Sequence, residues 1–388
     1  MLFRSMKALV EPGRALTEAE IQRYSRHILI PEIDLVGQQR IANAKVLCVG
    51  AGGLGSTNIM YLAAAGIGTI GIIDFDLVQL SNLQRQVIHS QQDIGKRKVL
   101  SAAKKVEELN SNVNVIIHDA MLTHENALEI FANYDLIIDG TDNFATRYLI
   151  NDAAALSNKP YIWGSIYQFD GQASVFWSKV GPCYRCLHPT PPPPGSVPSC
   201  AEGGVLGAIC ASIGSIQVTE AIKLITGIGE PLIGKLLIYD ALSLKQEQVA
   251  VKVRPDCPIC NGSQRQLLAD YQAFCGASQN YLTAAELKSM FMNQEDFLLI
   301  DVREPWEYEE FHIPGAQLIP MSLFKDGSVI SQFPKDRQIV LQCQSGSRSA
   351  NCLEILVDAS ISNVTHLEGG IMAWIQNENK EKIGRAHV

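Results

Sequence analysis

A six-residue loop near the end of the chain could hold a reactive sulfur. Cys343 and Arg348 enclose Gln-Ser-Gly-Ser, after an apolar strand pattern and ahead of a helix predicted over 347–358. Backbone N–H groups of such a loop and the N-terminus of the helix would point toward the thiol and stabilise a thiolate or a persulfide. Arg348 adds a fixed positive charge. A phosphatase loop has the same architecture, and an inert buried cysteine is the third interpretation.

A glycine-rich turn near the start of the chain could bind phosphate. Gly50, Gly52 and Gly55 form the pattern G-x-G-x-x-G between a predicted strand and a predicted helix. The glycines permit a tight turn and close approach of the backbone to a ligand, and the helix N-terminus presents free N–H groups. Asp74 ends the next predicted strand and can accept hydrogen bonds from ribose hydroxyls. The pattern predicts a nucleotide site without separating NAD from ATP.

Charged residues after the turn favour ATP. Arg85 lies in the run SNLQRQ, and Lys98 closes the run GKRK. A nucleotidyltransferase uses such cations to stabilise charge on transferring phosphoryl groups, whereas a dehydrogenase has no need of them. Asp142, which follows another predicted strand, could hold Mg²⁺. Taken singly, each cation would be interpreted as a solvated surface charge.

Five short runs together resemble the MoeB/ThiF family, whose members are relatives of ubiquitin-activating enzymes. GAGGLG, DFD, SNLQRQ, GKRK and GTDN occur in the order and spacing of that family. The resemblance implies a Rossmann-like domain over 16–262. It also implies that this domain uses ATP to adenylate the C-terminal glycine carboxylate of a small ubiquitin-like sulfur carrier, of the MoaD/ThiS type.

The resemblance assigns roles to single residues. Asp142 matches the magnesium-binding and catalytic aspartate of the family, and Arg85 is a second expected catalytic residue. Arg26, in RYSRH, matches an arginine that the family supplies across a dimer interface, so a homodimer is expected; by itself the sequence shows a charge on an amphipathic helix. The full expected nucleotide-binding set is Gly50, Gly52, Gly53, Gly55, Asp74, Asp76, Ser81, Asn82, Leu83, Gln84, Arg85, Lys98, Asp142, Asn143 and Arg26.

Two C-x-x-C pairs predict a structural zinc site. Cys183 and Cys186 form the first pair, and Cys257 and Cys260 form the second. Four thiolates make a closed tetrahedral Zn²⁺ site with no open position for a substrate. Redox dithiols are the alternative, but neither pair opens a helix in the manner of thioredoxin. The family resemblance also implies zinc here.

Cys200 follows a proline-rich stretch and precedes two glycines. A cysteine on a long loop could reach an activated carboxylate and form a thioester or an acyl disulfide. A small buried apolar residue is an equal interpretation. The MoeB/ThiF resemblance implies a link between this position and the ubiquitin-like partner, so Cys200 is counted among the catalytic candidates. Cys48, Cys210 and Cys352 are expected in the core.

The end of the chain resembles a rhodanese domain, over about 281–376. The runs FLLIDVREPWEYEEFHIPGAQLIP, QIVLQCQSGSRSA and HLEGGIMAW carry the likeness. Rhodaneses carry a persulfide on the cysteine that Cys343 matches and pass its outer sulfur to an acceptor. Asp301 and Arg303 match a supporting DVR element, and Glu304 and His312 are further candidates. The domain is predicted over 281–378.

The elements that must position these residues alternate between strands and helices. Apolar runs predict strands at 45–50 and 69–76, and periodic runs predict helices at 17–30, 96–110 and 207–226. This alternation is typical of a doubly wound α/β fold with a mostly parallel sheet. The proline-rich stretch 183–200 predicts a long loop without helix or central strand. A linker at 263–280 precedes a second, small α/β domain.

Composition sets broad limits. The 388 residues are 47% hydrophobic with a net charge of −8, which predicts two or three packed domains and argues against nucleic acid as a direct partner. No apolar stretch of membrane-spanning length and no signal peptide is recognised, so no membrane partner and a cytoplasmic location are expected.

The two resemblances explain each other. One domain would activate a carboxylate as an acyl-adenylate, and the other would deliver a persulfide as the nucleophile. This fused architecture resembles the MoeZ-type adenylyltransferases/sulfurtransferases and implies a thiocarboxylated carrier for molybdopterin or related biosynthesis. It also implies a persulfide donor such as a cysteine desulfurase. The alternatives are a nucleotide-binding scaffold with a phosphatase-like or inactive second domain, and an NAD-dependent oxidoreductase.

Overall fold

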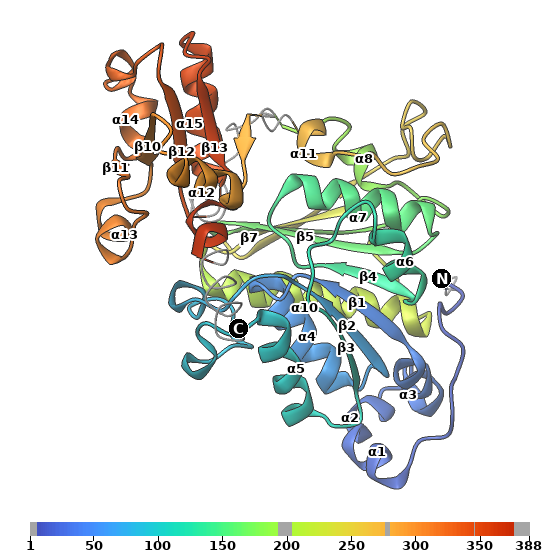
Figure 1. Cartoon of the computed structure of the whole chain (residues 1–388). Helices are drawn as coiled ribbons and strands as arrows, with labels where there is room; N and C mark the ends of the chain where they lie inside the picture. The colour runs from blue at the N-terminus through green and yellow to red at the C-terminus, as the bar shows by residue number, and fades with distance from the viewer. Residues whose placement is uncertain (1–5, 193–203, 276–279, 345, 376–388) are drawn as a thin grey trace. The chain divides into compact units, whose positions relative to one another are not determined.

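The fold is described from a computed structural model, in which residues 6–192, 204–275, 280–344 and 346–375 are placed. These residues separate into two compact units (Figure 1). The first unit extends to Tyr271, and the second begins at Gln272.

The first unit is built on a sheet of eight strands in the order β3-β2-β1-β4-β5-β6-β7-β8. The first five strands of that order pair in parallel, and the remaining pairs are antiparallel. Only Gln168 and Phe169 separate β5 from β6, too few residues for the crossover that parallel pairing needs. The bounds are β1 (Lys45–Val49), β2 (Thr69–Ile73), β3 (Asn114–His118), β4 (Leu136–Asp139), β5 (Tyr161–Tyr167), β6 (Asp170–Phe176), β7 (Lys235–Asp240) and β8 (Lys245–Ala250).

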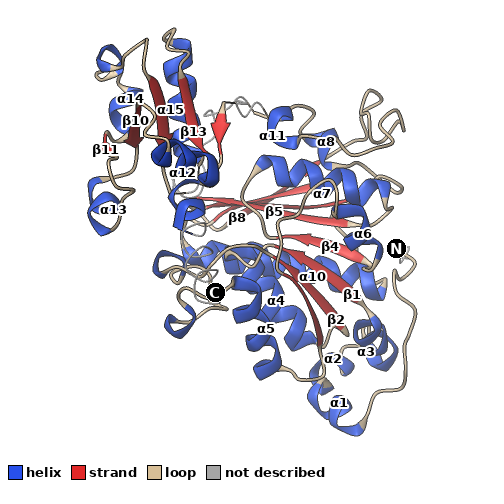
Figure 2. Cartoon of the chain, viewed as in Figure 1, coloured by secondary structure: helices blue, strands red, loops and turns tan. Residues whose placement is uncertain are grey.

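Helices cover both faces of this sheet, which confirms the doubly wound class. The chain passes from β1 to β2 toward one edge and from β4 to β5 toward the other. Right-handed crossovers in opposite directions place their helices on opposite faces, as Figure 2 shows for α4 and α7. The helices are α3 (Asp34–Asn43), α4 (Gly53–Ala65), α5 (Lys98–Leu109), α6 (Ala127–Ala132), α7 (Phe144–Leu156) and α10 (Gly207–Thr226).

The helix α10 is the central packing element of the unit. Its bounds agree with the predicted 207–226, and it ends at Gly227, which has a φ of 78°. It packs against α4 and β5, and its buried residues include Ile213 and Leu224. Among the described helices it alone is long and apolar enough to cross a membrane, but more than half of that stretch is buried inside the unit. These contacts are those of a core helix.

The predicted helix over 17–30 is in fact two short helices, α1 (Glu18–Arg23) and α2 (Ser25–Ile28). The chain breaks at Tyr24, whose hydroxyl accepts a hydrogen bond from Asn110 at 2.9 Å. Burying the Tyr24 ring in the core stabilises the fold more than one continuous helix would. The capping box predicted for Thr17 and Glu20 is confirmed by reciprocal hydrogen bonds of 3.3 and 2.8 Å.

The proline-rich stretch also differs from its prediction. A one-turn helix, α8 (Tyr184–Leu187), begins directly after Cys183 and contains Cys186. The prolines begin only at Pro189, so Tyr184 to Leu187 are free to turn. Residues 193–203, which include Cys200, lie outside the described residues. The polar edge strand β8 was also missed, because its exposed residues show no apolar alternation.

The second unit has a five-stranded parallel sheet in the order β11-β10-β12-β13-β9. The predicted strands around Asp301 and Cys343 are confirmed, and Cys343 directly follows the central strand β12. The bounds are β9 (Tyr281–Leu282), β10 (Phe297–Asp301), β11 (Gln317–Leu318), β12 (Gln338–Gln342), β13 (Val364–Leu367), α11 (Tyr271–Phe274), α12 (Ala284–Met292), α13 (Pro305–Glu310), α14 (Met321–Lys325) and α15 (Ser347–Asp358).

We expect the second unit to lose stability in mild acid because of His366 on β13. This ring is 8% exposed, and burial lowers its pKa to about 4. The folded state therefore binds its proton less readily than the unfolded state, whose histidine titrates near 6.5. Stability is complete above about pH 6.5 and falls by about 3 kcal/mol as pH drops toward 4. Denaturant melts of His366→Asn should show a much flatter pH dependence, whereas equal slopes in both proteins would contradict the assignment.

Candidate functional site

The glycine-rich turn joins β1 to α4 in a conformation that only glycine permits. Gly50 has a φ of 92°, and a Cβ there would lie 3.0 Å from the carbonyl oxygen of Gly140. A Cβ on Gly55 would lie 2.0 Å from the Gly50 oxygen, so the turn is closed by backbone contact. Gly52 caps α4, and Gly53 is its first residue. The free N–H groups of a 13-residue helix therefore begin at this turn, as an anion site requires.

The middle residue of the turn is held from both sides. The N–H of Ala51 donates to the Asp74 carboxylate at 2.8 Å, and its carbonyl oxygen lies 3.0 Å from Nε2 of His89. Burial lowers the pKa of His89, so its ring is neutral and Nε2–H donates. Its Nδ1 then accepts from the Ser101 hydroxyl at 2.9 Å. His89 was missed by the sequence reasoning, although its place four residues after Arg85 was a usable signal.

Of the two acidic residues after β2, Asp76 binds a buried lysine and Asp74 lies near its charge. Lys98, the first residue of α5, is 6% exposed, and its Nζ lies 2.8 Å from Asp76. Burial raises the pKa of Asp74, and the nearby charge of Lys98 opposes that effect. The other Asp74 oxygen accepts the Asp76 N–H at 2.8 Å. Each Asp74 oxygen keeps a second acceptor position, which a ribose hydroxyl can use.

The SNLQRQ segment lies against the turn. A Cβ on Gly53 would be 3.8 Å from Cγ of Arg85, and the Arg85 guanidinium donates to the Ser81 carbonyl at 3.1 Å. Asn82 is buried and accepts the Gln79 N–H at 3.1 Å. Leu83 is half-buried, and the carbonyl oxygen of Gln84 packs against the first residue of α10. Arg85 thus lies at the glycine turn, and the neighbouring residues of the segment hold it there.

Asp142 lies in the loop that follows β4. This loop touches the turn through Gly140, and Asp142 itself is exposed. Asn143 caps α7 by accepting the Thr146 N–H at 2.9 Å. Two buried residues below the loop, Asp139 and Arg147, were missed, and both bond to Thr141. Asp139 accepts the Thr141 N–H at 2.8 Å, and Arg147 donates to the Thr141 carbonyl at 3.2 Å.

Arg26 is not brought to the turn of its own chain. It is exposed on α2, and the adjoining Tyr24 packs against Gly66 at the C-terminal end of α4. The glycine turn lies at the N-terminal end of the same helix. Thirteen residues separate the two ends, a length of about 20 Å. Arg26 therefore does not line the glycine turn of its own chain.

The four predicted cysteine ligands come together. The sulfurs of Cys183, Cys186, Cys257 and Cys260 all lie within 4.8 Å of one another, with separations of 4.0, 3.5 and 3.5 Å for three of the pairs. A tetrahedral Zn²⁺ site with ordinary Zn–S bonds has sulfurs about 3.8 Å apart. The Arg254 N–H donates to the Cys186 sulfur at 3.5 Å, as is usual around a metal thiolate. The cluster therefore fits zinc.

A buried carboxylate ties the cysteine cluster to the rest of the unit. Asp152 on α7 accepts two hydrogen bonds from Arg185, which lies between the first two cysteines, at 2.8 and 2.7 Å. It also accepts from Gln264 at 2.9 Å and from the Tyr271 hydroxyl at 2.8 Å. Both of these residues follow the second cysteine pair in the chain. Nothing local in the sequence marks this network, because all three donors lie more than 30 residues from Asp152.

Removing the metal should unfold this corner of the first unit. We expect Cys257→Ser and chelator-treated protein to lose about one zinc per chain, and the melting temperature to fall by at least about 10 °C, because a closed zinc site contributes folding free energy directly. Metal analysis and thermal melts measure both effects. Cys48→Ser, which removes a buried thiol from β1, is the control that should keep its zinc. An unchanged metal content in Cys257→Ser would contradict a four-cysteine site.

In the second unit the Cys343 sulfur lies inside its loop. It accepts a hydrogen bond from the Gly346 N–H at 3.1 Å, and the Ser349 hydroxyl lies 3.6 Å away. Gly346 has a φ of 95°, which turns its N–H inward. The α15 helix begins at the next residue. This arrangement stabilises negative charge on sulfur, as predicted for a persulfide carrier.

Two arginines flank the loop. The Arg303 guanidinium binds Asp301 at 2.7 Å and reaches Gln344 of the loop at 3.2 Å, so the DVR element supports the loop. The Arg348 guanidinium forms two hydrogen bonds with Glu307 of α13. His312 is exposed and stacks on the Tyr308 ring. Glu307 was not identified from the sequence.

Comparisons with known proteins agree with both units. The ThiF family matches residues 24–259, and the rhodanese-like domain matches residues 283–377. The chain is 50% identical to "Probable adenylyltransferase/sulfurtransferase MoeZ" of Mycobacterium tuberculosis, over 98% of this chain and 99% of that protein. It is 50% identical to "Sulfur carrier protein adenylyltransferase" of Thermus thermophilus, over 67% of this chain and 98% of that one.

Two more distant matches are informative. "Adenylyltransferase and sulfurtransferase MOCS3" of Drosophila ananassae is 38% identical over 92% of this chain and 84% of that protein. The crystal structure of E. coli MccB superposes with a TM-score of 0.56 at 24% identity, over 61% of this chain and 74% of that one, which shows the fold of the first unit. The chain belongs to the ThiF family, as an adenylyltransferase and sulfurtransferase whose second domain is rhodanese-like.

Proposed function

We propose that the first unit adenylates the C-terminal glycine carboxylate of a MoaD/ThiS-like sulfur carrier and that Cys343 then supplies the sulfur. The observation that carries this proposal is one chain holding both a glycine turn with Arg85 and Lys98 beside it and a loop that stabilises a thiolate. The first can activate an acid with ATP, and the second can attack the activated acid. The relatives named above as sulfur carrier adenylyltransferase and adenylyltransferase/sulfurtransferase support it.

In the first half-reaction, a carboxylate oxygen of the carrier attacks the α-phosphorus of ATP. The bond to the pyrophosphate oxygen breaks, and pyrophosphate leaves with the electron pair. The N–H groups at the start of α4, with Arg85 and Lys98, stabilise the charge on the phosphates. Asp142 would hold Mg²⁺, which neutralises phosphate charge when bound. Arg26 of the partner subunit would add a further cation, and the working form would then be a homodimer.

In the second half-reaction, the outer sulfur of a Cys343 persulfide attacks the acyl carbon, and AMP leaves. The product is an acyl disulfide between Cys343 and the carrier. A second thiolate, from Cys200 or from a small thiol, attacks the Cys343 sulfur and releases the carrier thiocarboxylate. A disulfide to Cys343 remains and must be reduced by further thiol. A cysteine desulfurase is the proposed source of the persulfide, and molybdopterin or a related sulfur-containing cofactor is the proposed destination.

The closed cysteine cluster has a structural role in this scheme, with zinc as its proposed ion. It offers four thiolates and leaves no coordination position for a substrate. Thiolates and a persulfide persist in a reducing compartment, so the cytoplasm is the proposed location.

The test is pyrophosphate exchange. Full-length chain, Mg-ATP and a purified carrier that ends in Gly-Gly should exchange labelled pyrophosphate into ATP. A carrier without its last glycine is the matched control. If exchange stays at background with MoaD-like and ThiS-like carriers alike, the proposed substrate class is wrong.

A further inference from the structure

The positive charge beside the sulfur loop is already neutralised. Nη1 and Nη2 of Arg348 lie 2.6 and 2.7 Å from the two carboxylate oxygens of Glu307. The two side chains are 18% and 10% exposed, so water screens this two-point pair only in part. Burial acts to raise the pKa of Glu307, but hydrogen bonds from Arg348 and from the Glu304 N–H hold it below its ordinary value. The carboxylate is therefore charged at neutral pH.

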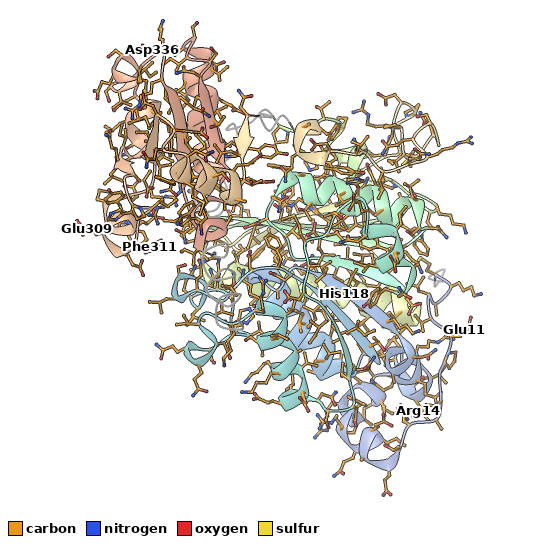
Figure 3. The ribbon with its side chains drawn as sticks, viewed as in Figure 1. Glu11, Arg14, His118, Glu309, Phe311 and Asp336 are labelled. Carbon is orange, nitrogen blue, oxygen red and sulfur yellow. The ribbon has the colours of Figure 1, made fainter. Side chains whose placement is uncertain are left out.

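The second arginine at the loop is matched in the same way. Arg303 and Asp301 form a buried pair with a closest approach of 2.7 Å. The two arginines and two carboxylates around Cys343 thus sum to zero charge. Further carboxylates, Glu309 and Glu310, are exposed on α13 (Figure 3 shows Glu309 at the outer edge of the unit). A small dianion approaching this loop finds no uncompensated cation among these four side chains.

We propose that Glu307 is a positioning residue that sets the sulfur donor. By holding Arg348 in a two-point ion pair, it keeps the loop from binding small oxyanions, so the loop accepts sulfane sulfur from a protein cysteine persulfide in preference to a dianion such as thiosulfate. The inference rests on Cys343 carrying the sulfur, as proposed above.

The chemistry of the two donors shows why this pair discriminates. With thiosulfate, the Cys343 thiolate attacks the outer sulfur, the S–S bond breaks, and sulfite leaves with the electron pair and two negative charges. A loop arginine that is free can bind that leaving group, whereas Arg348 would first have to release Glu307. With a protein persulfide, the leaving group is a cysteine thiolate with one charge, and contacts between the two proteins supply the binding. The same pair explains why the loop is unsuited to a phosphate dianion.

The decisive variant is Glu307→Gln, which keeps the shape of the side chain and removes its charge. In the full chain with thiosulfate as donor and cyanide as acceptor, we expect KM for thiosulfate to fall at least about fivefold with kcat changed less than about twofold, because a partly buried charge is uncovered. The rate ratio of iodoacetate to iodoacetamide at Cys343, read by mass spectrometry of its peptide, should rise at least about threefold. A purely structural role for Glu307 would not change this ratio.

Matched variants make the result interpretable. Glu309→Gln removes an exposed charge from the same helix and should leave both measurements unchanged. Glu307→Gln combined with Arg348→Gln removes both charges and should return the alkylation ratio to the wild-type value, even if Glu307→Gln alone folds poorly. An unchanged thiosulfate KM and an unchanged ratio in Glu307→Gln overturn the proposal. If Cys343 carries no sulfur, turnover is absent in every variant while the ratio still tests the charge, so the two failures are distinguishable.

Discussion

Cys343→Ala should abolish sulfur transfer to the carrier and leave pyrophosphate exchange at its wild-type rate. The Cys343 sulfur is the proposed nucleophile, and it accepts a hydrogen bond from the Gly346 N–H at 3.1 Å. Without it no persulfide forms, so thiocarboxylate formation should fall at least about 1,000-fold. Exchange depends on groups of the first unit, such as Arg85 and Lys98, which the substitution does not touch. Mass spectrometry of the carrier measures the first effect, and labelled ATP measures the second.

The control for this variant is Cys352→Ala on α15. Cys352 is fully buried in the core of the same domain, so its loss tests whether removal of any buried thiol disturbs the unit. We expect a stability cost of about 1 kcal/mol and retained sulfur transfer. If Cys343→Ala lowered exchange as much as transfer, the two half-reactions would not be separable, and the division of labour proposed above would be wrong.

Features fixed by short-range pattern were predictable from the sequence. The capping box at Thr17, the helix that ends at Gly227 and the strand that ends before Cys343 each depend on residues a few positions apart. The two C-x-x-C pairs were also predictable as a set, because each pair carries half of a metal site by itself. The glycine turn belongs to the same class, since backbone closure alone demands glycine at Gly50 and Gly55.

Hydrogen-bond and ion-pair partners that are far apart in the sequence were not predictable. The sequence shows Arg348 as a positive charge. Only the structure shows that this charge is paired with the carboxylate of Glu307, 41 residues away. Likewise nothing local marks Asp152 as the acceptor for Tyr271, 119 residues later. Such pairs are set by topology, which brings α13 to the start of α15 and the end of the first unit to α7. The break at Tyr24 has the same origin, because a tertiary contact there outweighs helix propensity.

The distinction matters for the nucleotide site, where local and long-range effects meet. Gly53 and Arg85 lie 32 positions apart, yet the aliphatic part of Arg85 packs on Gly53. The sequence motif predicted the roles, and the structure shows how they are held: His89 and Asp74 fix Ala51, while the Ser81 carbonyl orients Arg85. The catalytic role proposed for Arg85 would therefore cost folding little, since its side chain is half-exposed and forms no buried ion pair among those of the described residues.

This separation makes Arg85→Met the sharpest test of adenylation. The substitution keeps an unbranched side chain against Gly53 and removes the guanidinium. Pyrophosphate exchange should fall about 100- to 1,000-fold, the usual effect of removing one preorganised group that stabilises transition-state charge. The melting temperature should change by no more than about 2 °C, because the lost hydrogen bond to Ser81 is partly solvated. Loading of sulfur onto Cys343 should be unaffected.

The matched control is Lys96→Met, two residues before Lys98 in the same GKRK run. Lys96 is exposed, and its amino group lies 3.3 Å from the Asp93 carboxylate. If both variants lost exchange equally, the effect would come from general loss of positive charge near the site. If Arg85→Met retained most of its activity, Lys98 and a partner's Arg26 would have to supply the phosphate contacts. A large loss confined to Arg85→Met would mean that the Arg85 guanidinium stabilises the charge that develops on the transferring phosphoryl group.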